Sequence, residues 1–220
     1  MSKNKEIAII VDTNIYTPGD NTSYDLTDLP LKGYYNHVNL IKELNLEDKV
    51  DILIPEVVLL ELLQHNKKRF ESNCKLLKRI SQDFINLDIT IVGIDDLDYG
   101  VYFEKLKKRY YKELKVIFLP SNKKELFKDI LNRYYREFPP FEENNDEGFK
   151  DTLIFLSILN FLKKGLYEKY VFFSDDKIFK NKKKNLERQF NYFLKNHPSL
   201  KKCKFEIVNN KDIYSYIKNI

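Results

Sequence analysis

The stretch Ile7-Ala8-Ile9-Ile10-Val11-Asp12-Thr13-Asn14 decides the fold of this chain. Its five apolar residues are too few and too rich in β-branched side chains for a helix, and they favour a strand that is buried on both faces. The run ends abruptly at Asp12. Open α/β sheets carry their functional residues just beyond the carboxyl ends of the strands. We therefore expect Asp12 to mark a functional edge, and we expect later acids to converge on it.

Short apolar runs alternate with helical patterns along the rest of the chain. Further strands are predicted at residues 50–54, 89–92, 170–173 and 204–208. Helices are predicted at residues 13–16, 36–46, 56–65, 66–86, 97–117, 123–136, 149–161, 180–196 and 211–219, and loops at 18–33 and 142–148. Pro55 is expected in the first turn of a helix, and Gly165 just beyond the end of one. Such alternation is typical of a parallel sheet with helices on both faces.

The expected fold class is therefore α/β, a three-layer α/β/α sandwich with a mainly parallel central sheet. We expect one domain over residues 1–220, with a helical insertion at about 67–138. Of the 220 residues, 43% are hydrophobic, which is enough for a sizeable core, and no apolar run is long enough to span a membrane. The first strand starts almost at once, which argues against a signal peptide.

The two cysteines suggest a reducing environment. Cys74 and Cys203 have neither the spacing of a metal site nor that of a redox motif. Disulfides are rare in reducing compartments, and a chain of this size with two lone cysteines fits such a compartment. We therefore expect a cytoplasmic protein.

Charge is distributed unevenly along the sequence, whose net charge is +5. Residues 1–66 and 139–162 together hold 6 Lys and Arg against 16 Asp and Glu, whereas residues 67–138 hold 17 against 11 and residues 163–220 hold 15 against 6. An acidic centre with basic arms suits a metal-dependent enzyme that acts on a polyanion. A basic surface that serves only solubility would give the same pattern.

Acidic residues recur where the position of Asp12 leads us to expect them. Glu61 lies in an apolar helix after the second strand, and Asp151 lies in the first turn of the helix at 149–161. Asp175 and Asp176 directly follow the strand at 170–173. Each acid also has a simpler explanation, namely a helix cap, a favourable interaction with a helix dipole or, for Glu61, a lysine partner. Because the pattern recurs four times in order, we favour a joint site.

Carboxylates that are held close together in a protein interior need a cation, because an isolated buried charge is costly. Hard oxygen ligands without a nearby His or Cys pair favour Mg²⁺ or Mn²⁺ over Zn²⁺. Mg²⁺ typically binds one or two carboxylates together with waters and substrate phosphates. The acids therefore predict a Mg²⁺ or Mn²⁺ site that leaves room for a phosphodiester and an attacking water.

Four segments together resemble the PIN-domain family of nucleases. They are Val11-Asp12-Thr13-Asn14, Pro55-Glu56-Val57-Val58-Leu59-Leu60-Glu61-Leu62, Phe149-Lys150-Asp151-Thr152-Leu153-Ile154 and Phe173-Ser174-Asp175-Asp176-Lys177-Ile178-Phe179. The resemblance is to the metal-dependent ribonucleases of this family, such as the VapC-type toxins, and it covers residues 1–66 and about 149–180. It implies an endoribonuclease that hydrolyses RNA in a toxin or RNA-processing role.

The resemblance also implies roles for individual residues. By this resemblance, one or two Mg²⁺ or Mn²⁺ ions would be held by Asp12, Glu61, Asp151 and an acid after the predicted strand at 170–173. The family pattern Thr/Ser-x-Asp-x-x-Phe matches Ser174, Asp176 and Phe179, so Asp176 is the expected fourth ligand and catalytic residue, with Asp175 in reserve.

Three polar residues near these acids are predicted to contact the substrate. Ser174 would orient a water or ligand, and Asn14 would hydrogen-bond Asp12 or the substrate. His65 lies four residues after Glu61, so both can share a helix face. His65 is either a substrate contact or a histidine at the edge of the core.

Basic and aromatic residues are mixed in two fragments of the helical insertion. These residues are Arg109, Tyr110, Tyr111, Lys112, Arg133, Tyr134, Tyr135 and Arg136. Single-stranded RNA is often held by such residues, with bases on rings and phosphates on cations, although the tyrosines could equally be half-buried core residues. Lys177 and Lys180, next to the fourth acid, would contact phosphate or lie on a solvated helix face.

RNA, single-stranded or structured, is the expected partner, and no membrane contact is expected. The resemblance to toxins adds an antitoxin protein and a second copy of the chain. The alternative function is a catalytically inactive PIN-like module that binds RNA or protein, and the presence of all four acids argues against it. A phosphatase of the haloacid-dehalogenase type would need a second acid two residues after the first, where this chain has Asn14.

Overall fold

The computed structural model describes residues 5–16, 32–87, 98–141, 148–200, 202–209 and 212–220. Its centre is a five-stranded sheet in the order β3-β2-β1-β4-β5. The strands are β1 (Lys5–Val11), β2 (Val50–Pro55), β3 (Lys115–Ile117), β4 (Tyr167–Phe173) and β5 (Lys204–Val208). Every neighbouring pair is parallel, as the alternation of strands and helices in the sequence predicts.

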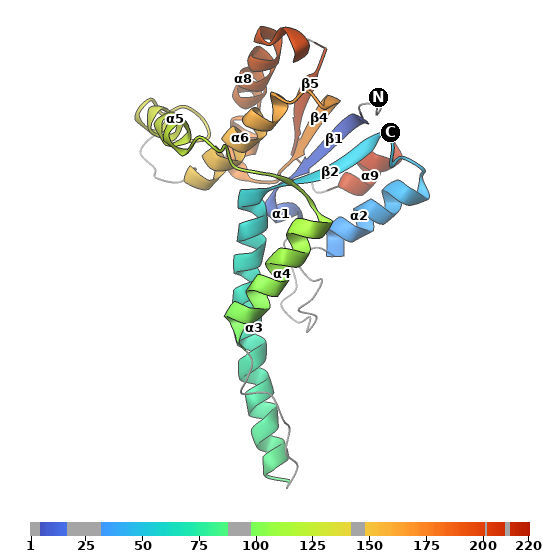
Figure 1. Cartoon of the computed structure of the whole chain (residues 1–220), viewed down its shortest axis with the longest axis vertical. Coiled ribbons are helices and arrows are strands. Elements are labelled where there is room, and N and C mark those ends of the chain that lie inside the picture. Colours follow the sequence, from blue (N-terminus) through green and yellow to red (C-terminus); the bar gives the residue numbers. More distant parts are fainter. Residues whose placement is uncertain (1–4, 17–31, 88–97, 142–147, 201, 210–211) are drawn as a thin grey trace.

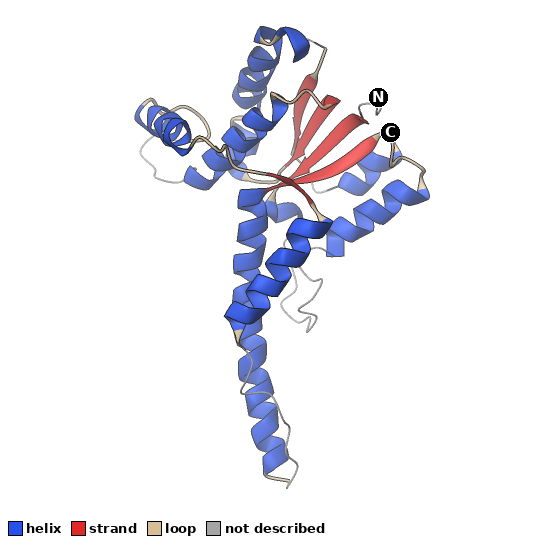
Figure 2. Cartoon of the chain, viewed as in Figure 1, coloured by secondary structure: helices blue, strands red, loops and turns tan. Residues whose placement is uncertain are grey.

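Helices cover both faces of this sheet (Figures 1 and 2). On one face lie α6 (Phe149–Leu162) and α8 (Lys183–Asn196), and on the other lie α2 (Lys32–Glu43) and α9 (Ile213–Lys218). The remaining elements are α1 (Thr13–Tyr16), α3 (Glu56–Ile85), α4 (Tyr99–Glu113), α5 (Lys123–Tyr135), α7 (Lys177–Asn181) and a short 3-10 helix at Pro198–Leu200. The predicted α/β/α sandwich is confirmed.

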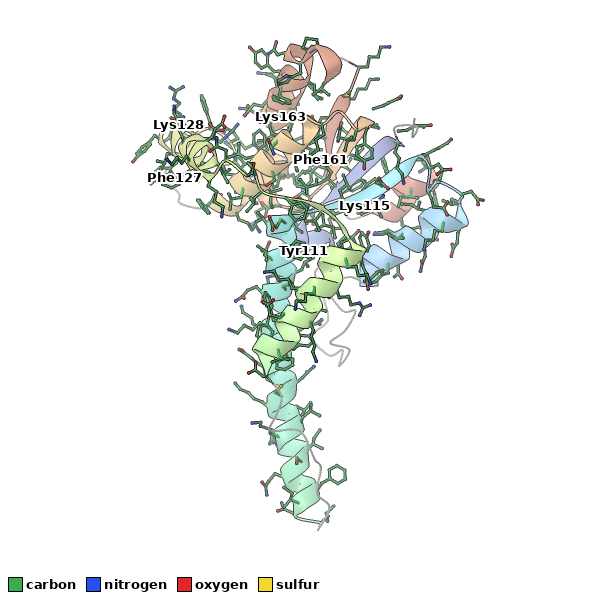
Figure 3. All side chains as sticks on the ribbon, viewed as in Figure 1. Tyr111, Lys115, Phe127, Lys128, Phe161 and Lys163 are labelled. Atoms are coloured by element: carbon green, nitrogen blue, oxygen red, sulfur yellow. The ribbon has the colours of Figure 1, made fainter. Side chains whose placement is uncertain are left out.

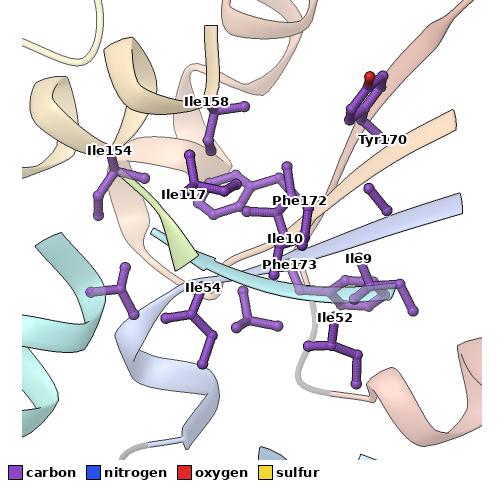
Figure 4. Close-up of a cluster of buried hydrophobic side chains, with 14 of the residues drawn as sticks. Ile9, Ile10, Ile52, Ile54, Ile117, Ile154, Ile158, Tyr170, Phe172 and Phe173 are labelled. Atoms are coloured by element: carbon purple, nitrogen blue, oxygen red, sulfur yellow. The ribbon is translucent and has the colours of Figure 1, made fainter. Parts of the chain in front are cut away.

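Strands β1 and β4 are buried on both faces, as their continuous apolar runs require. Ile10 pairs with Phe172, and Figure 4 shows both side chains on the side of the sheet that carries Ile154 of α6. On the opposite face, the ring of Phe173 lies edge-on to Tyr216 of α9, with centroids 5.3 Å apart. The core therefore has two layers of side chains, which hold the ends of β1 and β4 in place.

The order of the strands reverses between β1 and β4. From β1 the chain adds β2 and β3 on one side, and it then adds β4 and β5 on the other. The carboxyl ends of β1 and β4 therefore form the topological switch point of the sheet. Val11 pairs with Phe173 at the last position of the ladder. The next residues, Asp12 and Ser174, lie side by side where open α/β sheets bind their ligands.

Helices α3 and α4 form an arm that projects from the sheet (Figure 1). With its 30 residues, α3 is about 45 Å long at the usual rise of 1.5 Å per residue. The half of α3 nearer the sheet packs against α4, where Phe70 stacks on Tyr102 with centroids 4.8 Å apart and Tyr110 is fully buried. Asp98 caps α4 by accepting hydrogen bonds from backbone amides.

Several predicted elements need correction. Residues 115–117 form strand β3 rather than the end of a helix, because Val116 and Ile117 pair with the edge of β2. The helices predicted at 56–65 and 66–86 are one continuous helix, α3. Pro55 is the last residue of β2 and precedes α3 with ψ 140°, so it does not lie in the first helical turn.

Other predictions differ in their boundaries. Gly33 lies in α2 rather than in a loop, and a Cβ there would come within 2.8 Å of the Tyr16 ring. Residues 180–196 are divided between α7 and α8, with Lys182 between them. Gly165 follows α6 with a positive φ of 58°, as predicted for a residue beyond a helix end. The predicted strand at 89–92 and most of the loops at 18–33 and 142–148 lie outside the described residues.

A buried ionic cluster joins the amino ends of four strands, and the sequence analysis missed it. Asp51 of β2 accepts hydrogen bonds from Lys5 at 2.8 Å, from Tyr167 at 2.7 Å and from Lys115. Burial alone would raise the pKa of Asp51, but the hydrogen bonds from Lys115, Lys5 and Tyr167 outweigh it and lower the pKa. The cluster lies at the opposite edge of the sheet from Asp12.

No helix in the described ranges is both long and apolar enough to cross a lipid bilayer.

Candidate active site

Asp12 lies at the tip of β1 with 1% of its surface exposed. Its Oδ1 accepts a 2.7 Å hydrogen bond from the Thr13 amide, and its Oδ2 accepts a 2.6 Å hydrogen bond from the Ser174 hydroxyl. Burial raises the pKa of Asp12, and both hydrogen bonds oppose that rise because they favour the ionised form. The carboxylate is thus held in one orientation at the switch point.

Glu61 reaches the same region from the second turn of α3. Its Oε2 accepts a hydrogen bond from the Thr13 hydroxyl, and its Oε1 forms a 3.0 Å ion pair with Lys150. Glu61 therefore has the lysine partner that its simpler explanation requires. That lysine lies in the first turn of α6, directly before Asp151, so the ion pair belongs to the acid cluster.

Asp151 is 5% exposed, and its environment disfavours the ionised carboxylate. In the part of the chain that the structure describes, its Oδ1 is buried without a hydrogen-bond partner. Burial, followed by the charge of Asp176, raises the pKa of Asp151 to about 7, and Asp12 and Glu61 add to the rise while Lys150 opposes it. A helix dipole alone would favour the charged form of Asp151, so it does not explain this environment.

Gly148 fixes the position at which α6 begins. It has a φ of 103°, and a Cβ there would lie 2.8 Å from the carbonyl oxygen of Pro140. Glycine adopts this left-handed region without the steric cost that other residues incur. The close approach of Gly148 to Pro140 therefore determines where Lys150 and Asp151 enter the site.

The residues after β4 form a hydrogen-bonded loop around Asp12. The Ser174 Oγ accepts from the Asp176 amide at 3.2 Å while it donates to Asp12, and the Asp176 Oδ1 caps α7. Asp175 is exposed, and its amide donates to the Asn14 Oδ1 at 3.2 Å. Asn14 therefore hydrogen-bonds the loop after β4. This corrects the alternative in which Asn14 bonds Asp12, and its contact with the substrate stays a prediction.

An open pocket of about 460 Å³ lies beside these acids, within the usual size range of ligand sites. Its lining consists of Asn14, Gly148, Asp151, Asp175, Asp176, Lys177, Ile178 and Asn181. Asp12 and Glu61 lie outside this lining, but their charges act on Asp151. Asp176 acts electrostatically on both Asp12 and Asp151, which favours it over Asp175 as the fourth member of the cluster.

The other residues that were predicted to contact the substrate differ in their position relative to the pocket. Lys177 lines the pocket, whereas Lys180 is exposed on α7 and does not belong to the lining. Ser174 is fully buried, so it acts on Asp12 and is not open to a ligand. His65 is exposed on α3, four residues beyond Glu61, and is not at the edge of the core.

The two basic and aromatic fragments have different environments. In the first, Tyr110 is fully buried, and Tyr111 donates its hydroxyl to Glu56 at 2.8 Å while its ring stacks on Phe118 with centroids 5.9 Å apart, so both rings are engaged within the protein. In the second, the Arg133 guanidinium lies 4.3 Å from the centroid of the Phe155 ring and is engaged in packing. Tyr135 is 77% exposed on α5, so the second fragment keeps a ring at the surface.

The described residues contain no ready-made group of three His, Cys, Asp or Glu side chains that could hold a metal ion. Both oxygens of Asp12 and both oxygens of Glu61 are engaged by protein groups. The chemistry of the donors nevertheless fits a hard divalent cation, since the acids offer oxygen atoms alone and Asp151 Oδ1 is buried without a partner among the described residues.

A comparison with known families supports this interpretation of the site. A family model of the PIN domain matches residues 9–179, which is well over half of the chain. The chain belongs to the PIN-domain family. No curated protein and no solved structure matches it. PIN domains are generally nucleases, that is hydrolases, and they generally use divalent metal ions. The match spans β1 to α7, and therefore every residue of the acid cluster.

Three residues of this PIN domain were missed by the sequence analysis. Thr13 contacts both Asp12 and Glu61, Lys150 pairs with Glu61, and Gly148 sets the start of α6. Lys150 stands directly before Asp151, but adjacent helical residues do not share a face, so its contact with Glu61 depends on how α3 and α6 pack together. The need for glycine at position 148 depends on its close approach to Pro140, a contact that no local pattern reveals.

Proposed function

We propose that this PIN domain is a metal-dependent endoribonuclease that hydrolyses phosphodiester bonds of RNA. The proposal depends above all on Asp151, whose Oδ1 is buried without a partner among the described residues and faces the charges of three other acids. Burial and the neighbouring acids disfavour the ionised form of Asp151, and a bound cation would stabilise that form. Asp12, Glu61, Asp151 and Asp176 would hold Mg²⁺ or Mn²⁺, with Asp175 in reserve.

The residues of the chain would divide the chemistry between them. A bound divalent cation supplies Lewis-acid polarisation of the phosphate and activation of water. Asp12 stays fixed by its hydrogen bonds from Ser174 and the Thr13 amide, so its orientation is set before substrate arrives. Asp151, whose pKa is raised to about 7 in the absence of metal, would lose its proton when a cation binds and would then serve as an ionised ligand. Lys177, in the lining of the pocket, would neutralise a phosphate of the RNA.

RNA is proposed as substrate because basic and aromatic side chains remain at the surface beside the catalytic core. Figure 3 labels Phe127 and Lys128 on the outside of α5, and Phe127, Tyr134 and Tyr135 are all exposed there. Rings of this kind stack on unpaired bases, and neighbouring cations contact phosphates. The projecting arm of α3 and α4 adds further lysines and arginines (Figure 1).

The cellular role is a further part of the proposal. The resemblance to VapC-type toxins supports a toxin that an antitoxin protein neutralises in the cytoplasm, with RNA processing as the other role and a second copy of the chain as a further partner. Growth arrest on expression of the wild type, relieved by Asp12→Asn, would support the toxin role. Normal growth during expression of an active nuclease would support RNA processing.

A nuclease assay tests the proposed activity. Purified full-length protein is incubated with single-stranded RNA and single-stranded DNA, with Mn²⁺ or with EDTA. We expect Mn²⁺-dependent internal cleavage of RNA, which Asp12→Asn and Asp176→Asn abolish. Asp83→Asn, an exposed acid on the far part of α3, is the matched control and should cleave normally. Unchanged cleavage by folded Asp12→Asn would contradict the site assignment.

A catalytically inactive binding module is the second candidate function. The observation in its favour is the Lys150–Glu61 ion pair, which places a protein cation on one of the four acids. An inactive module would bind RNA with the same affinity in Mn²⁺ and in EDTA, and it would leave the RNA intact in both.

A further inference from the structure

Lys150 makes the closest positive contact with the acid cluster in the described structure. Its Nζ lies 3.0 Å from the Glu61 Oε1, while the other Glu61 oxygen accepts from the Thr13 hydroxyl. Lys150 is held there by the backbone, because it occupies the first turn of α6 that Gly148 positions. The contact is therefore part of the fold of the site rather than a chance surface pair.

The charge of Lys150 reaches beyond Glu61. It lowers the pKa of Asp12 and the pKa of Asp151, so it favours the ionised form of both buried acids. Burial by itself would lower the pKa of Lys150, but the hydrogen bond and the charge of Glu61, with the charges of Asp12 and Asp151, outweigh burial and raise it. Lys150 thus partly neutralises the repulsion among the carboxylates in the protein as described.

A divalent cation on the same acids would meet Lys150 as a competitor. Two cations on one carboxylate repel each other strongly when they are only a few ångströms apart and partly shielded from water. We propose that Lys150 is a built-in counter-cation of the acid cluster, that a divalent cation must displace it from Glu61, and that Lys150 thereby sets the metal affinity of the site. This inference rests on the proposed function, because it takes the four acids as metal ligands.

Metal binding by Lys150→Met tests the proposal directly. Titration of the full-length protein with Mn²⁺ alone, followed by calorimetry, gives the dissociation constant without any need for activity. We expect Lys150→Met to bind Mn²⁺ about threefold to fivefold more tightly than the wild type, since the Lys150–Glu61 pair is partly exposed and such pairs contribute up to about 1 kcal/mol. Without metal, the same variant should melt at a lower temperature, because the carboxylates then lack their counter-cation.

Three further variants separate this effect from other causes. Lys150→Arg keeps the charge and should bind Mn²⁺ with the wild-type affinity. Lys150→Gln removes the charge but can still donate to Glu61, and it should bind more tightly than the wild type even if Lys150→Met does not fold. Lys163→Met removes one charge at the other end of α6 (Figure 3) and should leave the affinity unchanged.

The outcomes distinguish the two proposals. Equal Mn²⁺ affinity in the wild type, Lys150→Met and Lys150→Gln would overturn the role of Lys150 and leave the proposed nuclease intact. Tighter binding in these variants without any RNA cleavage would support the role of Lys150 and contradict the nuclease. Absence of Mn²⁺ binding in all of them would overturn both.

Discussion

The Ser174 hydroxyl donates a 2.6 Å hydrogen bond to the Asp12 Oδ2, and so joins the ends of β4 and β1 across 162 positions of sequence. Both residues are buried, and Ser174 also accepts from the Asp176 amide. One hydroxyl therefore orients a buried carboxylate and the loop that carries the fourth acid.

Ser174→Ala should lower stability and activity together. The buried Asp12 carboxylate would lose a hydrogen bond, which costs about 1.5–3 kcal/mol for a charged acceptor. RNA cleavage should fall about tenfold or more because the orientation of Asp12 is then no longer fixed. Urea unfolding and the cleavage rate measure the two effects. Ser157→Ala removes an equally buried hydroxyl that bonds only within α6, and it should leave cleavage unchanged.

Asp151→Asn should stabilise the metal-free protein at high pH. The folded pKa of Asp151 is about 7, well above the value in an unfolded chain, so ionisation of Asp151 costs stability as the pH rises from about 4 to about 7. The variant lacks this titration and should gain up to about 4 kcal/mol at pH 8 relative to the wild type. Urea unfolding in EDTA at pH 5 and at pH 8 measures the difference. An equal effect at both values of pH would contradict the prediction.

Asp51→Asn should have the opposite dependence on pH. The hydrogen bonds from Lys115, Lys5 and Tyr167 lower the folded pKa of Asp51, so their contribution is complete above about pH 4 and is lost as the pH falls through the lowered pKa. We expect a loss of about 1–2 kcal/mol at pH 7, because the lysine partners of Asp51 are partly exposed to solvent. Thermal melts at pH 7 and pH 3 should show that the gap between the variant and the wild type narrows in acid. A constant gap would refute the role of the ionised form.

Gly148→Ala should disturb the start of α6. A Cβ there would lie 2.8 Å from the Pro140 oxygen, and the φ of 103° is unfavourable for alanine, so we expect a loss of about 1–3 kcal/mol. Cleavage should fall as well, because α6 carries Asp151 into the site. The control is Gly100→Ala in α4, where φ is not positive and the nearest atom to the added Cβ is the terminal Oδ1 of the Asp98 side chain at 3.0 Å. That variant should keep wild-type stability and cleavage.

Tyr135→Ala should weaken binding of single-stranded RNA without loss of stability. Stacking of one base on a ring contributes about 1–3 kcal/mol, so the dissociation constant should rise about fivefold or more. Fluorescence anisotropy in EDTA measures binding without cleavage, and the affinity of the wild type should fall steeply with added salt. Tyr192→Ala is the matched control, since Tyr192 is 70% exposed on α8. Equal affinities for the two variants would exclude α5 as an RNA surface.

The sequence was sufficient for the parts of the fold that depend on local patterns. Continuous apolar runs identified β1 and β4, and the acid after each run indicated the edge of the sheet that carries Asp12. The sequence failed for β3, because three residues give too short a pattern and the strand depends on pairing with the edge of β2. The pairing of strands decides such an element, and a single sequence does not reveal it.

The four acids were predicted, but not the contacts that hold them. Thr13 and Lys150 join segments that are far apart in sequence, so local spacing could not reveal them. The aromatic residues were the hardest to interpret, since Tyr110 and Tyr134 hold the same position in two almost identical local sequences but are 0% and 43% exposed. Tertiary packing alone distinguishes these two tyrosines.

The distance in sequence between Asp12 and Ser174 has a consequence for protein synthesis. Because β1 and β4 are neighbours in the sheet, a ribosome must translate past Phe173 before the switch point can close. A nascent chain that ends before β4 carries Asp12, Glu61 and Asp151 but lacks the strand that brings the last acid to them. Chains that terminate before β4 are therefore without a complete cluster, and a cell that makes this protein is exposed to its proposed activity only from products that extend beyond Asp176.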